Sequence, residues 1–184
     1  RLGPRKRLLF AAPSSLADLR AGAHTAGASL VAALLGAVGG ALRAGFGDEP
    51  VARSAVVHAL VPIPSRETSA SGNHYGSTLV PLPLGLGDLG DRVRRARDDL
   101  AALARRHAGA AAVSLASAAG ATTAVIERLG VDFFSRRATV TVSSVRGPDR
   151  VLHLAGAAVT DVIVWAPAPG SVALSVTLMS YAGR

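Results

Sequence analysis

The chain of 184 residues contains no cysteine and few aromatic side chains. The lack of cysteine excludes disulfide bonds and thiolate-bound metal centres, although it leaves the redox compartment open. Aromatic residues make up only 4% of the chain, whereas hydrophobic residues make up 49%. We therefore expect a folded domain whose core consists mainly of alanine, valine and leucine.

Lysine is nearly absent as well. Lys6 is the only lysine among 20 basic residues, so the net charge of +8 comes from arginine. Such a charge can attract nucleic acid or an anionic membrane surface. However, no aromatic platform for stacking bases lies among the arginines, and Trp165 is the only tryptophan. We therefore predict that the chain does not bind nucleic acid.

One uncharged run lies in the N-terminal part of the sequence. The stretch at residues 26–42 is rich in alanine and glycine and is shorter than the roughly 20 apolar residues of a typical membrane span. We interpret it as part of a buried helix over residues 29–44. Gly36, Gly39 and Gly40 would be unfavourable on an exposed helix, so we predict that another backbone approaches them closely.

Helical signals occur in three further places. Ser15 can cap a helix that residues 24–27 would end. Asp88 opens the clearest amphipathic pattern, whose apolar stripe consists of Leu89, Val93, Ala96, Leu100 and Leu103. We interpret the charged residues off this stripe, which are Arg92, Arg95, Asp99 and Arg106, as a solvated face. A third long helix is predicted at residues 111–129.

Strand-like segments alternate with these helices. They lie at residues 7–12, 54–63, 76–82, 139–145, 157–165 and 172–180, and are bounded by glycine, proline and polar turns. Strands and helices are thus mixed along the chain. The predicted fold class is α/β (α+β), with a mixed β-sheet flanked by helices.

Short motifs with a known chemistry are absent from the sequence. There is no His-x-Glu-x-x-His, no Gly-Lys-Ser/Thr phosphate loop and no Gly-x-Ser-x-Gly nucleophile elbow. The five histidines are neither adjacent nor spaced as metal ligands, and we interpret them as surface or core residues: His24, His58, His74, His107 and His153. Residue patterns alone therefore name no reaction and no metal site.

Six segments, in this order, carry a resemblance to a known family. They are VAALLGAVGGALR at 31–43, VPIPSR at 61–66, Gly72-Asn73 followed by VPLP at 80–83, DLGDRV at 88–93, SSVRGP at 143–148, and LAG at 154–156 with SYAG at 180–183. They are similar to the family patterns NDVVLAAVAGALR, VPVSLR, Gly-Asn before Leu-Pro, DPxxRL, SNVPGP, and LAG with SYNG. In this respect the chain resembles the C-terminal domain of wax ester synthases/diacylglycerol acyltransferases.

The resemblance implies that residues 1–184 form a single domain, one lobe of the CoA-dependent acyltransferase fold shared with chloramphenicol acetyltransferase. The catalytic His-His-x-x-x-Asp-Gly motif of such enzymes lies in the N-terminal lobe and is absent from this chain. Its second histidine would deprotonate the acceptor hydroxyl, which then attacks the acyl-CoA thioester. The C-terminal lobe would form the opposite wall of the channel.

The resemblance also implies partners and a site. The partners are the N-terminal lobe, acyl-CoA as a substrate rather than a cofactor, and a long-chain alcohol or diacylglycerol. The location is cytoplasmic, with peripheral contact to a membrane or lipid droplet. The substrate-binding residues would be Ser143, Ser144 and Gly147 at the end of a predicted strand, together with Gly72 and Asn73.

Several positions depart from the family pattern. The Asn-Asp pair falls on Val31 and Ala32, the asparagine of SNVPGP falls on Ser144 and its first proline on Arg146, and the asparagine of SYNG falls on Ala182. These losses leave a second hypothesis open, in which the protein is a diverged, non-catalytic relative that binds a lipid or a partner. In either case we predict that residues 1–184 alone have no acyltransferase activity.

Overall fold

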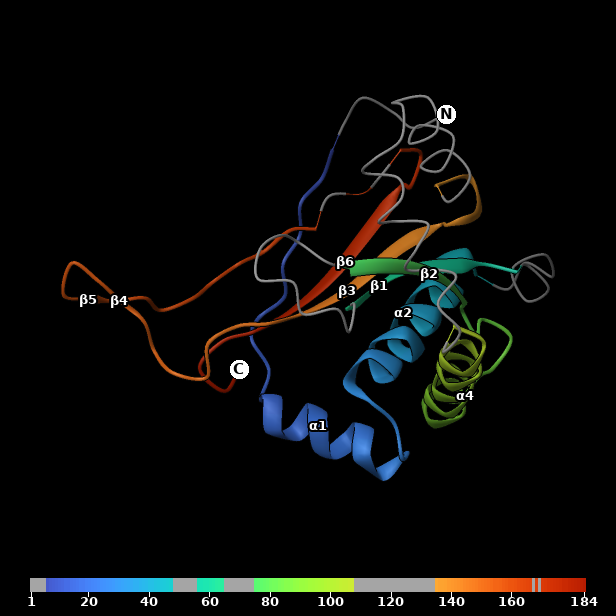
Figure 1. Cartoon of the computed structure of the whole chain (residues 1–184), viewed down its shortest axis with the longest axis horizontal. Coiled ribbons are helices and arrows are strands. Elements are labelled where there is room, and N and C mark those ends of the chain that lie inside the picture. Colours follow the sequence, from blue (N-terminus) through green and yellow to red (C-terminus); the bar gives the residue numbers. More distant parts are fainter. Residues whose placement is uncertain (1–5, 48–55, 65–74, 108–134, 167, 169) are drawn as a thin grey trace.

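The computed structural model describes residues 6–47, 56–64, 75–107, 135–166, 168 and 170–184 (Figure 1). The predicted helix at 111–129 lies outside the described residues. The same holds for two of the predicted substrate-binding residues, Gly72 and Asn73.

The centre of the fold is a four-stranded mixed sheet in the order β2-β1-β3-β6. The strands are β1 (His58–Pro64), β2 (Tyr75–Pro81), β3 (Val140–Arg146) and β6 (Leu174–Ser180). β1 pairs with β2 antiparallel, whereas the β1–β3 and β3–β6 pairs are parallel. Four of the six predicted strands correspond to these elements, and the predicted fold class is confirmed.

Three helices are described: α1 (Leu16–Thr25), α2 (Leu30–Phe46) and α4 (Leu89–His107). Each begins after a side chain that caps it, namely Ser15, Ser29 and Asp88, which accept hydrogen bonds of 3.2, 3.2 and 3.0 Å from main-chain N–H groups. The hydrogen bond from the Asp91 N–H lowers the pKa of the Asp88 carboxyl. Local capping chemistry therefore sets where the predicted helices begin.

Helices α2 and α4 lie together on one side of the sheet (Figure 1). The hydrophobic core lies between these helices and the sheet. It includes Ala32, Leu35, Val38, Ala59, Val61, Val80, Leu82, Leu84, Ala96, Val140 and Val142. Leu34 is partly buried against this cluster and Val38 is 7% exposed. The predicted buried helix is confirmed.

The helix glycines explain how α4 comes so close to α2. A Cβ atom built on Gly36 would lie 2.8 Å from Cγ2 and 3.0 Å from the main-chain N of Val93, so the backbone of α4 occupies that space. A Cβ on Gly40 would lie 2.6 Å from an Arg92 guanidinium nitrogen, whereas Gly39 makes only an ordinary contact. The predicted close approach is confirmed at Gly36.

Two predicted strands are wrong. Residues 6–15 form no strand, and Leu8, Leu9 and Phe10 are 58%, 89% and 73% exposed. Of the segment 157–165 only Ala157–Ala158 (β5) pairs, with His153–Leu154 (β4), in a two-stranded ribbon. Large apolar residues in the first segment and β-branched residues in the second favour an extended backbone. No strand among the described residues pairs with either segment along its whole length.

Among the described helices, none is long and apolar enough by itself to cross a bilayer. Helices α1 and α2 reach the required length and composition only as a pair, which is bent by 87°.

We expect Gly36→Ala to lower the free energy of unfolding by about 1–3 kcal/mol, because the added methyl group forces α4 away from α2. Gly45→Ala is the matched control, since it lies in the same helix with no heavy atom within 4 Å of its Cβ position. That change should raise stability by up to about 1 kcal/mol through helix propensity. Urea titrations measure both values, and an equal response would contradict the close approach.

Candidate functional site

The predicted site lies at the end of β3, next to the end of β6. Ser143 and Ser144 are consecutive strand residues, so their side chains point to opposite faces of the sheet. Ser143 is buried, and its Oγ lies 3.1 Å from Oγ1 of Thr177, where either hydroxyl can donate. Ser144 is exposed. The two serines therefore do not form one hydroxyl pair toward a shared ligand.

Ser143 belongs instead to a set of hydroxyl side chains on one face of β3 and β6. The parallel register pairs Thr141 with Ser175 and Ser143 with Thr177, and these four residues share that face. Thr177 Oγ1 also accepts a hydrogen bond from the N–H of Ala166 at 3.3 Å. The alternating Thr-Val-Ser at 141–143 and Ser-Val-Thr at 175–177 was the sequence signal that could have identified this set.

Thr141 differs from the other three hydroxyls. Its Oγ1 is buried and has no hydrogen-bond partner within the part of the chain that the structure describes. A buried polar atom without a partner is unfavourable and is open to an additional hydrogen bond. Among the described residues, the Thr141 hydroxyl is therefore the one on this face that is buried without a hydrogen bond.

Gly147 has a structural reason to be glycine. Its N–H donates to the Ser180 carbonyl at 3.0 Å, and a Cβ atom would overlap that carbonyl oxygen and approach Met179 Cε to 2.6 Å. Glycine therefore allows the chain after β3 to bond to the end of β6. Next to it, Arg146 and Asp149 form an exposed ion pair of 2.8 Å, and this hydrogen bond lowers the pKa of the Asp149 carboxyl.

Tyr181, which follows β6, was missed as a functional residue by the sequence analysis. It is 5% exposed, and its hydroxyl accepts from the Leu152 N–H and donates to the Val159 carbonyl, both at 2.8 Å. The following Ala182 N–H donates to Pro148 O at 2.9 Å. The C-terminal turn therefore holds the segment that follows β3.

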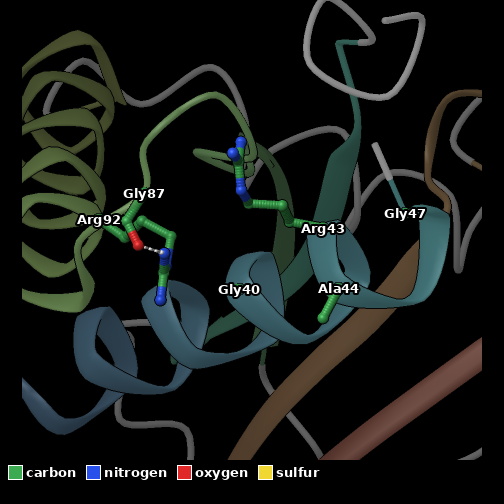
Figure 2. A pocket seen from close by; sticks show the side chains of 6 residues that line it. All are labelled: Gly40, Arg43, Ala44, Gly47, Gly87 and Arg92. Carbon is green, nitrogen blue, oxygen red and sulfur yellow. Dashed lines mark hydrogen bonds between the residues drawn. The ribbon is translucent and has the colours of Figure 1, made fainter. Parts of the chain in front are cut away.

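A cavity of about 400 Å³ lies elsewhere, at the end of α2, and is lined by Gly40, Arg43, Ala44, Gly47, Gly87 and Arg92 (Figure 2). Ser143, Ser144 and Gly147 do not line it. No group of three His, Asp or Glu side chains among the described residues could hold a metal ion.

The Arg92 guanidinium, which lines this cavity, already donates hydrogen bonds to main-chain carbonyls. Its Nε donates to Gly36 O at 3.0 Å, and one terminal nitrogen donates to Leu86 O at 3.0 Å. The same terminal nitrogen donates to Gly87 O at 2.7 Å (Figure 2). Arg43 donates likewise to Leu84 O at 2.9 Å. The interpretation of Arg92 as part of a solvated face is wrong, because its guanidinium joins α2 to the loop before α4. Arg95 fits that interpretation, since it is exposed and pairs with Asp99 at 3.0 Å.

We expect Ser143→Ala to lower the free energy of unfolding by about 1 kcal/mol, because the bond to Thr177 is lost inside the sheet. Ser144→Ala should change it by less than about 0.5 kcal/mol, since that side chain is exposed. Thermal and urea unfolding of the two variants measure this difference. A larger loss at position 144 than at position 143 would contradict the described orientation.

A family model and a solved structure match the chain. The WS/DGAT C-terminal domain family matches residues 71–184. The structure of the wax ester synthase/diacylglycerol acyltransferase from Marinobacter aquaeolei VT8 superimposes with a TM-score of 0.65 at 20% identity, over 92% of this chain. The chain spans 39% of the length of that protein. No curated protein sequence matches.

At 20% identity the structural similarity shows that the two proteins share a fold. The family match is independent of it and covers more than half of the chain, from the segment before β2 to the C-terminal turn. The chain therefore belongs to the C-terminal domain family of wax ester synthases/diacylglycerol acyltransferases.

Proposed function

We propose that this chain is the C-terminal lobe of an acyl-CoA-dependent O-acyltransferase that esterifies a long-chain alcohol or diacylglycerol. The observation that carries the proposal is the family match over residues 71–184. The shared fold with a solved wax ester synthase/diacylglycerol acyltransferase supports it. Acyl-CoA is a substrate in this proposal, and no resident cofactor is required.

The chemistry would be divided between two lobes. The sequence has no His-His-x-x-x-Asp-Gly motif, and the chain corresponds to 39% of the solved relative, so an N-terminal lobe would supply the catalytic histidine. That histidine removes the proton of the acceptor hydroxyl, the oxygen attacks the thioester carbonyl, and CoA leaves as the protonated thiol. The lobe described here would orient the two substrates against that histidine.

Substrate contacts in this proposal involve Ser143, Ser144, Gly147, Gly72 and Asn73. The hydroxyl face around Ser143 could donate hydrogen bonds to a polar substrate group or to the developing oxyanion. The exposed Ser144 would contact a different part of the channel. We also propose a cytoplasmic location with peripheral contact to a membrane or lipid droplet.

A second function is favoured by two positions in the structure. Ala32, which replaces the aspartate of the family pattern, lies on the buried face of α2, where a carboxylate would lose its hydration. Ala182, which replaces the asparagine of SYNG, has a φ of 48°. Both fit a diverged, non-catalytic relative that binds a lipid or a partner.

Transfer of a labelled acyl group from palmitoyl-CoA to hexadecanol by the full-length protein decides between the two functions. Activity is expected with both lobes present and absent with residues 1–184 alone. Ser144→Ala should lower the rate without changing the melting temperature, whereas Ser14→Ala, an exposed serine outside the sheet, should leave both unchanged. A full-length protein that binds lipid but transfers no acyl group would support the non-catalytic function instead.

The backbone at Ala182 gives a further prediction. A φ of 48° lies in the left-handed region, which asparagine tolerates better than alanine. Ala182→Asn should therefore raise the free energy of unfolding by up to about 1 kcal/mol. Ala158→Asn is the control, because Ala158 is an exposed strand residue without positive φ and should gain nothing. Calorimetric melting of both variants provides the measurement, and an equal effect would refute the prediction.

A further inference from the structure

The cavity at the end of α2 is lined by two arginines, Arg43 and Arg92, whose side chains are half-buried (Figure 2). Neither forms an ion pair with a carboxylate in the part of the chain that the structure describes. The neighbouring arginines of α4 differ, because Arg94, Arg95 and Arg97 each pair with an aspartate, at 2.7, 3.0 and 2.9 Å. Arginine charge without an ion-pair partner is therefore concentrated at the cavity.

Both guanidinium groups keep N–H donors for a further acceptor. An arginine side chain carries donors on Nε and on both terminal nitrogens. Arg92 uses Nε and one terminal nitrogen, all toward main-chain carbonyls of α2 and of the loop before α4. Arg43 uses one terminal nitrogen, toward Leu84 O at 2.9 Å. Within the described chain, the second terminal nitrogen of Arg92 and of Arg43 and the Nε of Arg43 donate to no acceptor.

The other lining residues are small and leave the cavity open. They are Gly40, Ala44, Gly47 and Gly87. A Cβ atom built on Gly47 or Gly87 would meet no heavy atom within 4 Å, so no described neighbour fills the space beside them. The volume of about 400 Å³ is in the range of small-molecule sites, which is roughly 300–1,000 Å³. A small anion in this cavity would lie beside arginine donors.

We propose that this cavity binds a phosphate group, carried either by a small molecule or by an anionic phospholipid, with Arg43 as the main contact and Arg92 as the second. Guanidinium groups form charge-assisted, bidentate hydrogen bonds with phosphate oxygens. A cleft lined by charge of one sign also attracts ions of the opposite sign. The site is separate from Ser143, Ser144 and Gly147, which do not line the cavity. It is therefore additional to the proposed acyl transfer and does not depend on it.

A purely structural role for the two arginines is the competing explanation. Arg43 lies in the last turn of α2, where a cation is favourable beside the free carbonyls of a helix end. However, carbonyl oxygens carry no net charge, so these hydrogen bonds leave the charges of Arg43 and Arg92 in place. Asp88 follows the lining residue Gly87, but its carboxylate caps α4 and does not line the cavity. A phosphate would supply the missing negative charge.

Apolar side chains next to the cavity make a phospholipid headgroup one of the two sources of phosphate. Phe46 and Leu86 are 45% and 37% exposed. They are the chain neighbours of the lining residues Gly47 and Gly87. A headgroup phosphate bound by the arginines would therefore place its lipid close to apolar side chains, whereas a small phosphate compound would need the arginines alone.

Thermal melting of the full-length protein in inorganic phosphate tests the proposal, with chloride used to keep the ionic strength constant. Phosphate should raise the melting temperature in a saturable way, which gives an apparent Kd. Arg43→Gln should raise that Kd at least about threefold, because a charged donor is lost. Arg95→Gln is the matched control, since it removes the same charge from an exposed arginine that pairs with Asp99 outside the cavity. It should leave the Kd unchanged.

A second pair of variants keeps both arginines and their bonds to the main chain. Ala44→Glu adds a carboxylate at the cavity and should also raise the Kd for phosphate at least about threefold, because it competes for the guanidinium groups. Ala41→Glu is the control, because Ala41 is exposed in the same helix and does not line the cavity. This pair remains informative if Arg43→Gln destabilises the fold through the lost bond to Leu84 O.

Cosedimentation with vesicles distinguishes the two sources of phosphate. Binding to phosphatidylglycerol but not to phosphatidylcholine vesicles, lost in Ala44→Glu and kept in Ala41→Glu, would identify a headgroup. Saturable stabilisation by phosphate without vesicle binding would identify a small molecule. An equal response of Ala44→Glu and Ala41→Glu to both probes would overturn the proposal, as would no response of the unmodified protein to either. Since no readout uses acyl transfer, phosphate binding by an inactive protein would refute only the proposed catalytic function.

Discussion

The close approach of α2 and α4 at Gly36 is the contact on which the helical layer depends. Because Gly36 has no side chain, the backbone of α4 at Val93 lies against α2, and Arg92 reaches the Gly36 carbonyl. The same guanidinium binds Leu86 O and Gly87 O in the loop before α4. The start of α4 is thus fixed relative to both α2 and the end of β2. This in turn positions the apolar stripe of α4 over the sheet.

Strand β3 has two chemically different faces, and this difference decides what each candidate residue on it can do. Val140 and Val142 face the helices and are fully buried, whereas Thr141 and Ser143 alternate with them on the other face. Burial of apolar side chains stabilises the first face. The second face carries hydroxyls, of which Thr141 has no partner in the described chain. Thr141 and Ser143 therefore lie away from the valine face of β3, whereas the exposed Ser144 lies on the face of Val140 and Val142.

Helices and their caps could be predicted from the sequence because both depend on local features. The cap at Ser15 and the helix starts expected at Ser29 and Asp88 from the 3.6-residue period all lie within a residue or two of the observed starts. Strand-like composition was less reliable, since residues 7–12 and most of 157–165 have no described partner strand. The Arg92 guanidinium is held by the main-chain carbonyls of Gly36, Leu86 and Gly87. Hydrophobic periodicity does not predict such contacts. The alternation of side chains along a strand already places Ser143 and Ser144 on opposite faces. The hydrogen-bond partner of Ser143, Thr177, lies in another strand and could not be predicted from local sequence.

Two of the segments that resemble family patterns meet in space, and this contact gives them a structural meaning. Gly147 and Pro148 of SSVRGP bond to Ser180 and Ala182 of SYAG, through Gly147 N to Ser180 O and Ala182 N to Pro148 O. These two hydrogen bonds hold the ends of β3 and β6 together where the chain leaves the sheet. The Tyr181 hydroxyl adds hydrogen bonds to Leu152 N and Val159 O. A glycine at 147 is required by this geometry whether or not the protein is catalytic. The resemblance at these two segments therefore supports a shared lobe architecture more directly than a shared reaction.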